Sequence, residues 1–229
     1  MSEAPVITID GPSGSGKGTV SRLLARALGW HLLDSGALYR LTGVAGRRAG
    51  LAPDDEAAHA RAALAMDVRF GADAAGEPTV TLDGADATLA IRTEAAGERA
   101  SQVASFRAVR SALLDRQRRF AEPPGLVADG RDMGSVVFPA APLKVFLTAS
   151  PAERATRRFR QLVAAGVSAS LEAVAADIAS RDARDSGRAV APLVAAPGAV
   201  VLDTTGMDAE AAAQRILALA AERGLARPG

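Results

Sequence analysis

The chain reads Gly11-Pro12-Ser13-Gly14-Ser15-Gly16-Lys17-Gly18-Thr19 from residue 11 to residue 19. This stretch follows Val6–Asp10, a short β-branched run that predicts a buried strand. It opens a helix predicted over about residues 16–28, with Gly29 as the residue that ends it. A glycine-rich loop with a lysine between a strand and a helix is typical of a P-loop. Glycines let backbone N–H groups converge on phosphate oxygens, and the start of the helix adds positive potential. The stretch therefore predicts a site for the phosphates of a nucleoside triphosphate.

Two residues of this loop narrow its chemistry. Lys17 can reach between the transferred and leaving phosphates, whereas an ordinary glycine-rich turn needs no lysine here. Gly18 stands where a P-loop usually has a Ser or Thr that ligates magnesium, so no residue is predicted as a direct metal ligand. The Gly-Lys-Gly-Thr ending resembles nucleoside monophosphate kinases more than GTPases. The chain also has no asparagine, which rules out the Asn-Lys-x-Asp guanine motif.

Composition sets broad limits on the 229-residue chain. Apolar residues make up 48% of it, and 27 basic against 26 acidic residues give a net charge of +1, so we expect neither nucleic acid nor a membrane as partner. The absence of cysteine excludes disulfides and a thiol nucleophile. We see no signal peptide and no apolar run of the ~20 residues that a membrane span needs. The expectation is a monomeric cytoplasmic protein.

Further strands alternate with helices along the chain. The runs that predict strands lie at residues 30–33, 126–128, 143–147 and 199–202, and a last helix at about 209–223 has Asp208 as N-cap and Gly224 behind it. This alternation predicts an α/β fold with a five-stranded parallel sheet flanked by helices. The interval between the second and third strands is too long for one crossover. Within it we expect a small antiparallel insert with strands at 67–70, 79–82 and 87–91, turns at 73–77 and 83–84, and two helices over about 93–121.

Charged and polar blocks accompany the predicted elements. They read Asp34-Ser35-Gly36-Ala37-Leu38-Tyr39-Arg40, Asp129-Gly130-Arg131-Asp132-Met133-Gly134, Ser150-Pro151-Ala152-Glu153 and Arg181-Asp182-Ala183-Arg184-Asp185-Ser186-Gly187-Arg188, the last followed by Ala189-Val190-Ala191-Pro192-Leu193. The first three follow strands, at the edge where open α/β sheets bind ligands. Together with the P-loop, and in this order, the blocks resemble bacterial cytidylate kinases over nearly the full chain, the antiparallel insert included.

The resemblance implies a reaction and a site. The reaction would be ATP + CMP ⇌ ADP + CDP, with dCMP also used and Mg²⁺ required. It implies a single P-loop kinase domain over 1–229, with a monophosphate-binding region at about 36–123 and a lid at about 151–166. Catalytic roles would belong to Lys17, Asp129, Arg131 and Arg157. The acceptor would be bound by Ser35, Tyr39, Arg40, Ser101, Arg110, Arg131, Asp132, Arg181, Asp185 and Arg188.

The resemblance also implies which part of the acceptor each of these residues would contact. Ser35, Arg110 and Asp132 would meet the cytosine, with Tyr39 and Ser101 beside it; Arg40, Arg131 and Arg188 would hold the acceptor phosphate, and Arg181 and Asp185 would face the sugar. For Asp132 and Arg110, the hydrogen-bond donors and acceptors of cytosine agree with these roles. A carboxylate such as Asp132 accepts from the 4-amino group, and an arginine such as Arg110 donates to N3 and O2, whereas uracil reverses the polarity at two of these positions.

Some of the charged residues could have a purely structural role or simply be exposed to solvent. Arg154, Arg157 and Arg158 share one helical face, which is either a phosphate clamp or a solvated surface, and Glu153 can pair with Arg157. Asp177, Arg181 and Asp185 follow one another at i, i+4 spacing and could form only an ion-pair ladder. Asp129 is expected to hold magnesium through water.

Two other functions remain open from the sequence. One is a related kinase with another acceptor, such as UMP, AMP, thymidylate or shikimate. The other is a nucleotide-binding module without turnover, or a switch protein.

Overall fold

A computed structural model describes residues 4–73, 78–164, 166–188 and 191–225. The chain divides into two compact units, one made of Met1–Asp34 with Arg118–Gly229 and one made of Ser35–Gln117. We call the first the sheet unit and the second the insert unit, and each is described by itself. The expectation of one domain over 1–229 stays a prediction.

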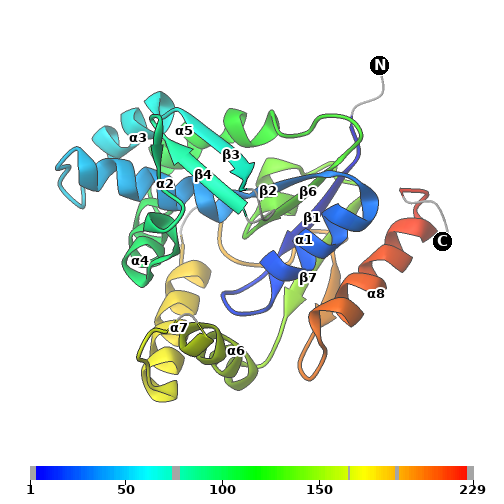
Figure 1. Cartoon of the computed structure of the whole chain (residues 1–229). Helices are drawn as coiled ribbons and strands as arrows, with labels where there is room; N and C mark the ends of the chain where they lie inside the picture. Colours follow the sequence, from blue (N-terminus) through cyan, green and yellow to red (C-terminus); the bar gives the residue numbers. More distant parts are fainter. Residues whose placement is uncertain (1–3, 74–77, 165, 189–190, 226–229) are drawn as a thin grey trace. The chain divides into compact units, whose positions relative to one another are not determined.

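The sheet unit is built on a five-stranded parallel sheet (Figure 1). Its strands, in the order β2-β6-β1-β7-β8, are β2 (His31–Asp34), β6 (Leu126–Gly130), β1 (Val6–Asp10), β7 (Leu143–Thr148) and β8 (Val200–Asp203). β1 is buried along its whole length, as its β-branched apolar residues predict for a central parallel strand. The α/β class and the five-stranded parallel sheet are therefore confirmed.

Helices α1 (Lys17–Leu28) and α8 (Ala209–Glu222) pack on each other and on the sheet. Leu24 and Ile216, both fully buried, meet Ile7 and Ile9 of β1 in this core. Gly29 ends α1 in the left-handed conformation, and the Asp208 side chain accepts the N–H of Ala211 at 2.7 Å, so both predicted caps are confirmed.

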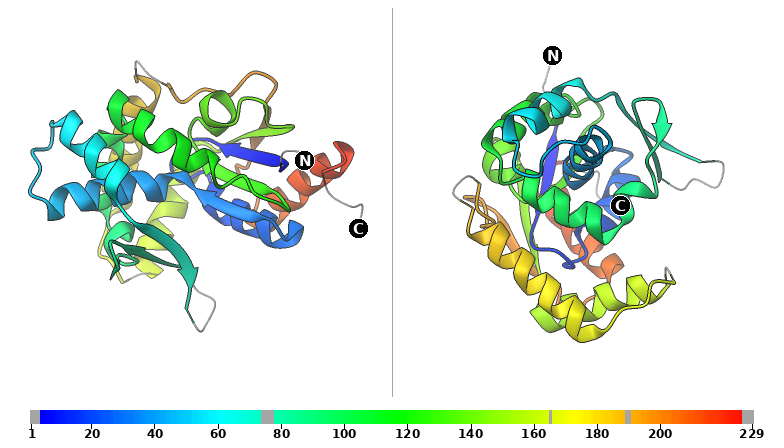
Figure 2. Two further views of the ribbon diagram at one scale, coloured as in Figure 1. Left: turned by 90° about the horizontal axis from the view of Figure 1, so that it is seen from above. Right: turned by 90° about the vertical axis from the view of Figure 1, so that its left-hand side faces the viewer.

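A helical hairpin and a short π-helix complete the sheet unit. Helix α6 (Pro151–Ala164) lies against α7 (Leu171–Ser186), as the right-hand view of Figure 2 shows in yellow-green and yellow. The Ser150 hydroxyl caps α6 by accepting the N–H of Glu153 at 3.2 Å. Glu153 does not complete a reciprocal capping box, because the Ser150 N–H donates to Thr205 Oγ1 instead, at 2.9 Å. The π-helix η2 (Met133–Val137) follows β6.

The insert unit combines helices with a small antiparallel sheet. Its elements are α2 (Ser35–Arg48), α3 (Glu56–Ala65), β3 (Val68–Ala72), β4 (Pro78–Leu82), β5 (Ala85–Asp86), the 3₁₀ helix η1 (Ala90–Arg92), α4 (Glu94–Val103) and α5 (Arg107–Arg118). Asp83 and Gly84, with φ of 53° and 79°, form the predicted turn between β4 and β5. Of the predicted turn at 73–77, residues 74–77 lie outside the described part of the chain.

The predicted strand at 87–91 is wrong. Pairing ends at Asp86, because its carboxylate accepts both the N–H of Thr88 at 2.9 Å and the Thr88 hydroxyl at 2.6 Å. This local turn replaces ladder hydrogen bonds with side-chain ones, and the chain continues into η1.

Within the described residues, no helix combines the length and apolarity that crossing a bilayer requires.

Candidate active site

The glycine-rich loop leaves β1 and is shaped by close contacts. A Cβ on Gly11 would lie 2.0 Å from the carbonyl oxygen of Leu147, and one on Gly14 would lie 3.0 Å from the Cβ of Arg154. Gly14 also has a φ of 76°, in the region that favours glycine. The Ser15 hydroxyl is buried and has no hydrogen-bond partner among the described residues. A buried unpaired hydroxyl in such a loop fits a site for an oxygen-rich ligand.

Lys17 is buried at the start of α1, and its Nζ donates to the Pro12 carbonyl at 2.7 Å. Burial lowers the pKa of Lys17 to about 7, and the Arg131 guanidinium acts in the same direction. The carboxylates of Asp129, Asp10 and Asp185 oppose that shift. An anionic ligand would stabilise the positive charge of Lys17, which is shielded from water and has one carbonyl partner. The site is therefore suited to bind an anion.

Asp10, which no sequence motif singles out, links the P-loop strand to the stretch after β6. Its carboxylate accepts the backbone N–H groups of Met133 and Gly134, each at 2.8 Å. Burial raises the pKa of Asp10 to about 6, and the Asp132 and Asp129 charges add to that rise. Because β1 and β6 are paired neighbours, this contact fixes the stretch that carries Arg131 and Asp132 beside the P-loop.

Asp129 lies near the end of β6, opposite Ile9 of β1. A Cβ on Gly18 would lie 3.4 Å from Asp129 Oδ2, so the carboxylate faces the start of α1. The glycine at position 18 thus leaves open the space next to this carboxylate. One carboxylate beside a phosphate-binding loop fits Mg²⁺, which takes one or two carboxylates together with phosphate oxygens and water.

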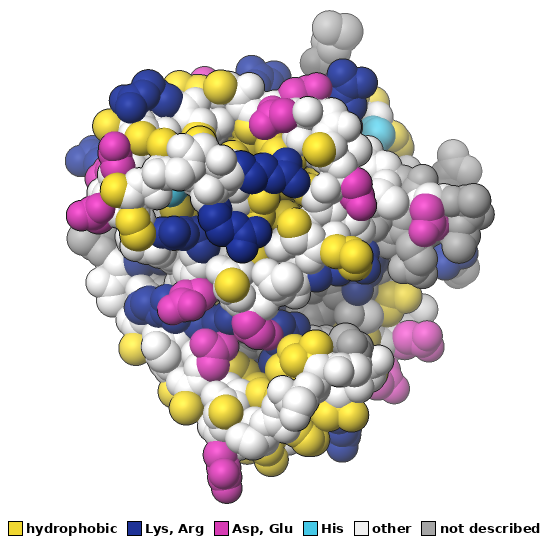
Figure 3. Space-filling view, turned by 60° about the vertical axis from the view of Figure 1, so that its left-hand side comes forward, with side chains coloured by type: hydrophobic (Ala, Val, Ile, Leu, Met, Phe, Trp, Pro, Cys, Tyr) yellow, Lys and Arg dark blue, Asp and Glu magenta, His cyan; other side chains and the backbone are white. Residues whose placement is uncertain are grey.

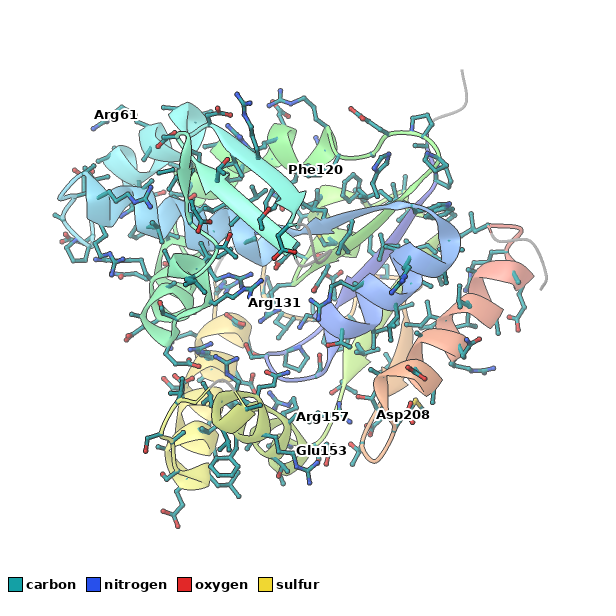
Figure 4. All side chains as sticks on the ribbon, in the orientation of Figure 1. Arg61, Phe120, Arg131, Glu153, Arg157 and Asp208 are labelled. Carbon is teal, nitrogen blue, oxygen red and sulfur yellow. The ribbon has the colours of Figure 1, made fainter. Side chains whose placement is uncertain are left out.

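Arg131 is held on three sides, and Figure 4 labels it. Its Nε donates to Asp185 Oδ2 at 3.1 Å, its Nη2 to the Ser13 hydroxyl at 3.0 Å and its Nη1 to the Gly130 carbonyl at 3.3 Å. Asp185, in the last turn of α7, also accepts from Arg188 Nη2. The predicted residues Arg131, Asp185 and Arg188 therefore form one cluster in the sheet unit.

The first step of the possible ion-pair ladder on α7 is formed. Arg181 pairs with Asp177 at 3.0 Å, four residues before it. The carboxylate of Asp185 also accepts hydrogen bonds from Arg131 and Arg188, which lie outside the i, i+4 series on α7.

Two of the α6 arginines, Arg154 and Arg157, contact the P-loop, whereas Arg158 of the same predicted face donates to Gln161 on α6 at 3.4 Å. Arg154 is buried, and its Nη1 donates to the Ser13 carbonyl at 3.1 Å. Its two Nη atoms also meet both carboxylate oxygens of Asp182 on α7, at 3.1 and 2.6 Å. Asp182 had no predicted role, since a partner 28 positions away leaves no local sequence signal.

Arg157 is the most fully bonded of these side chains. It pairs with Glu153 at 2.8 Å, as predicted, and Figure 4 shows the two side by side on α6. Its Nη1 donates to the Ser15 carbonyl at 3.3 Å and to Thr204 Oγ1 at 3.1 Å, and its Nη2 donates to the carbonyls of Thr204 at 2.6 Å and Met207 at 3.0 Å. All five N–H groups of the guanidinium therefore have protein acceptors.

The insert unit gathers its own set of predicted residues. Arg110 lies with its guanidinium carbon 5.9 Å from the centre of the Tyr39 ring and donates to the Ala104 carbonyl at 3.3 Å. The Ser35 hydroxyl donates to the buried amide oxygen of Gln117 at 2.8 Å. The Ser101 hydroxyl on α4 is buried with no hydrogen-bond partner among the described residues. Arg40 follows on α2 and is half-buried.

One face of the molecule carries many basic side chains, dark blue in Figure 3, with acidic ones in magenta among them. Since Lys17 and Lys144 are the only lysines of the chain, nearly all of these are arginines, whose planar fork suits phosphate oxygens. Ala189 and Val190 of the last sequence block lie outside the described residues.

A P-loop on the central strand, a buried lysine and paired arginines at the same sheet edge define the class of P-loop phosphotransferases. The comparisons with known proteins are more specific. The family model described as cytidylate kinase matches residues 7–222. The cytidylate kinase of Pseudomonas savastanoi pv. phaseolicola is 59% identical over 225 residues, covering 98% of each chain. Those of Azotobacter vinelandii and Bordetella pertussis are 58% and 55% identical, covering 99% and 93% of this chain and 100% and 94% of their own. The chain belongs to the cytidylate kinase family.

Proposed function

We propose that this protein transfers the γ-phosphoryl group of ATP to CMP, and to dCMP, giving CDP or dCDP and ADP. The observation that carries the proposal is the position of Lys17, buried in the P-loop next to Asp129 of β6 and Arg131, which follows that strand. Transfer between two phosphates needs positioning and charge neutralisation more than a strong base.

The P-loop, Gly11–Thr19, binds the donor. Its backbone N–H groups hold the ATP phosphates, and Lys17 exchanges its bond to the Pro12 carbonyl for phosphate oxygens. Arg157 joins by giving up its contact with the Ser15 carbonyl, at 3.3 Å the longest of its bonds. The lid at about 151–166 closes over the donor and excludes water that would otherwise hydrolyse ATP.

Magnesium accompanies ATP in this proposal, and Asp129 holds it through water. When bound, it neutralises charge on the transferred phosphate. Gly18 contributes by leaving room beside the Asp129 carboxylate.

The acceptor phosphate is oriented for in-line attack by Arg40, Arg131 and Arg188. Arg181 and Asp185 face the sugar. Asp132 and Arg110 read the cytosine with Ser35, and Tyr39 and Ser101 line the pocket. Support comes from the Arg131–Asp185–Arg188 cluster in the sheet unit and from the Arg110–Tyr39 contact in the insert unit.

A panel of acceptors in an ADP-release assay tests the substrate. CMP and dCMP are expected to give the highest kcat/KM, with UMP far below. Faster transfer to UMP, AMP, thymidylate or shikimate would favour a different kinase, and no transfer to any acceptor would favour a binding module.

Two variants test the residue roles. Lys17→Ala should leave a folded protein with transfer nearly abolished, so retention of most of the kcat contradicts its role. Asp132→Ala should mainly erode the preference for CMP over UMP, because a mispaired buried polar group costs roughly 1–3 kcal/mol. An unchanged CMP/UMP ratio of kcat/KM would remove Asp132 from base recognition.

We also propose that the protein is a monomer that acts in the cytoplasm. Sedimentation of the purified protein and fractionation of cells test these two points.

A further inference from the structure

Ser13 receives a hydrogen bond from each of two arginines. Its hydroxyl accepts from Arg131 Nη2 at 3.0 Å, and its carbonyl accepts from Arg154 Nη1 at 3.1 Å. Each arginine is in turn paired with a carboxylate of α7, Arg131 with Asp185 and Arg154 with Asp182. The five residues close a ring that joins the P-loop to the last turns of α7, and we call it the Ser13 ring.

The ring constrains the Arg131 guanidinium. Three of its five N–H groups are used by Asp185, Gly130 and Ser13, one on each nitrogen. The remaining two, on Nη1 and Nη2, have no acceptor among the described residues. A guanidinium fixed through three bonds presents those two N–H groups in a set direction, which suits bidentate contact with a phosphate.

We propose that the Ser13 hydroxyl is a positioning residue for the acceptor phosphate, although Ser13 lies in the loop that binds the donor. This inference rests on the proposed role of Arg131. Ser13 contacts the acceptor only through Arg131, and the P-loop thereby sets the orientation of the arginine that receives CMP.

The backbone and the side chain of Ser13 have separate tasks. A P-loop residue binds the donor phosphates through its backbone N–H, which any replacement except proline retains. Ser13→Ala removes only the hydroxyl, so Arg131 loses one of three anchors while the loop keeps its backbone donors. The defect is therefore expected on the acceptor side.

Steady-state kinetics with each substrate varied in turn test this separation. In Ser13→Ala the KM for CMP should rise about 3- to 10-fold, as expected for the loss of one hydrogen bond of ordinary strength that acts on CMP through Arg131, while the KM for ATP changes less than about 2-fold. Ser13→Thr retains a hydroxyl and should restore most of the affinity for CMP. Ser180→Ala, which removes an exposed hydroxyl from α7, serves as the matched control and should leave both KM values unchanged.

A double-variant cycle tests whether Ser13 acts through Arg131. Arg131→Ala should raise the KM for CMP, and adding Ser13→Ala to it should cause no further rise. Additive effects would overturn the proposal, as would an increase in the KM for ATP alone or an inert Ser13→Ala. If Arg131→Ala leaves the KM for CMP unchanged, the acceptor role of Arg131 fails and the proposal fails with it.

Discussion

Arg154 on α6 and Asp182 on α7 form a bidentate ion pair, with N–O distances of 3.1 and 2.6 Å. The Arg154 side chain is only 5% exposed, whereas that of Asp182 is 28% exposed. Because the same guanidinium also holds the carbonyls of Ser13 and Ala149, the pair connects the helical hairpin to the P-loop. Removal of the Asp182 carboxylate would leave the buried guanidinium of Arg154 without its counter-charge.

Asp182→Ala is expected to lower the free energy of unfolding by about 2–3 kcal/mol, since it strands a buried arginine. Urea unfolding followed by circular dichroism measures the change. Asp67→Ala is the matched control, because its pair with Arg69 is exposed on both sides (58% and 79%) and should cost less than about 1 kcal/mol. Equal losses in the two variants would show that the buried pair has no special weight.

Asp10 should leave a signature in the pH dependence of stability. Its pKa is raised on folding from 3.8 to about 6, so between these pH values the native state binds a proton that the unfolded chain has released. As the pH rises from about 4 to 6 the unfolded chain gains stability by ionising Asp10, so the free energy of unfolding falls progressively, by roughly 3 kcal/mol in total. Asp10→Asn cannot ionise and should lose this decrease.

Denaturant unfolding of both proteins from pH 3.5 to 7.5 checks this difference. The stability of wild type relative to Asp10→Asn is expected to fall across the window and then level off above pH 6. A constant difference would mean that Asp10 titrates at its ordinary pKa.

The lowered pKa of Lys17 leads us to expect that the protein takes up a proton when it binds ATP. This pKa is lowered to about 7, so at pH 8 the free protein holds Lys17 mostly neutral, and donor phosphates would return the proton. The unfolded chain binds this proton up to about pH 10.5, so the same shift makes stability rise with pH between about 7 and 10.5.

Calorimetry of ATP binding in buffers of different ionisation enthalpy counts the protons. Close to one proton per ATP is expected at pH 8 and only a small fraction at pH 6, which serves as the internal control. Lys17→Arg, which is always charged, should remove the difference. Equal uptake by wild type at both pH values would contradict the assignment.

Gly18→Ala should separate stability from activity. Gly18 does not have a positive φ, so its backbone conformation accepts an alanine. The added methyl would lie 3.4 Å from Asp129 Oδ2 and 3.6 Å from Arg22 Nη1, which are ordinary van der Waals distances. Helix α1 should therefore gain up to about 1 kcal/mol. The methyl occupies the space proposed for the magnesium-bound phosphates, so kcat/KM for ATP should fall roughly ten- to a hundredfold.

Thermal unfolding and initial rates measured on one preparation test Gly18→Ala. An unchanged kcat/KM would show that the space beside Asp129 is not used by the donor.

Much of the fold was predictable because its determinants are local. The strand–loop–helix of the P-loop, the Gly29 and Asp208 caps and the Asp83–Gly84 turn depend on residues within a few positions of one another. The predicted strand at 87–91 failed for a similarly local reason, the turn between Asp86 and Thr88, which propensity does not weigh.

The amino-acid sequence by itself determined the class of sheet, the donor loop with Lys17, and the residues available to bind an acceptor. Only the tertiary structure decided which charges pair: Asp185 with Arg131, Asp182 with Arg154, and both arginines with Ser13. On a helix, sequence spacing identifies neighbours three or four residues apart, and for Asp177 and Arg181 that was enough. A guanidinium that meets a carboxylate 28 or 54 positions away does so because packed elements bring the two together, and no local pattern encodes that distance.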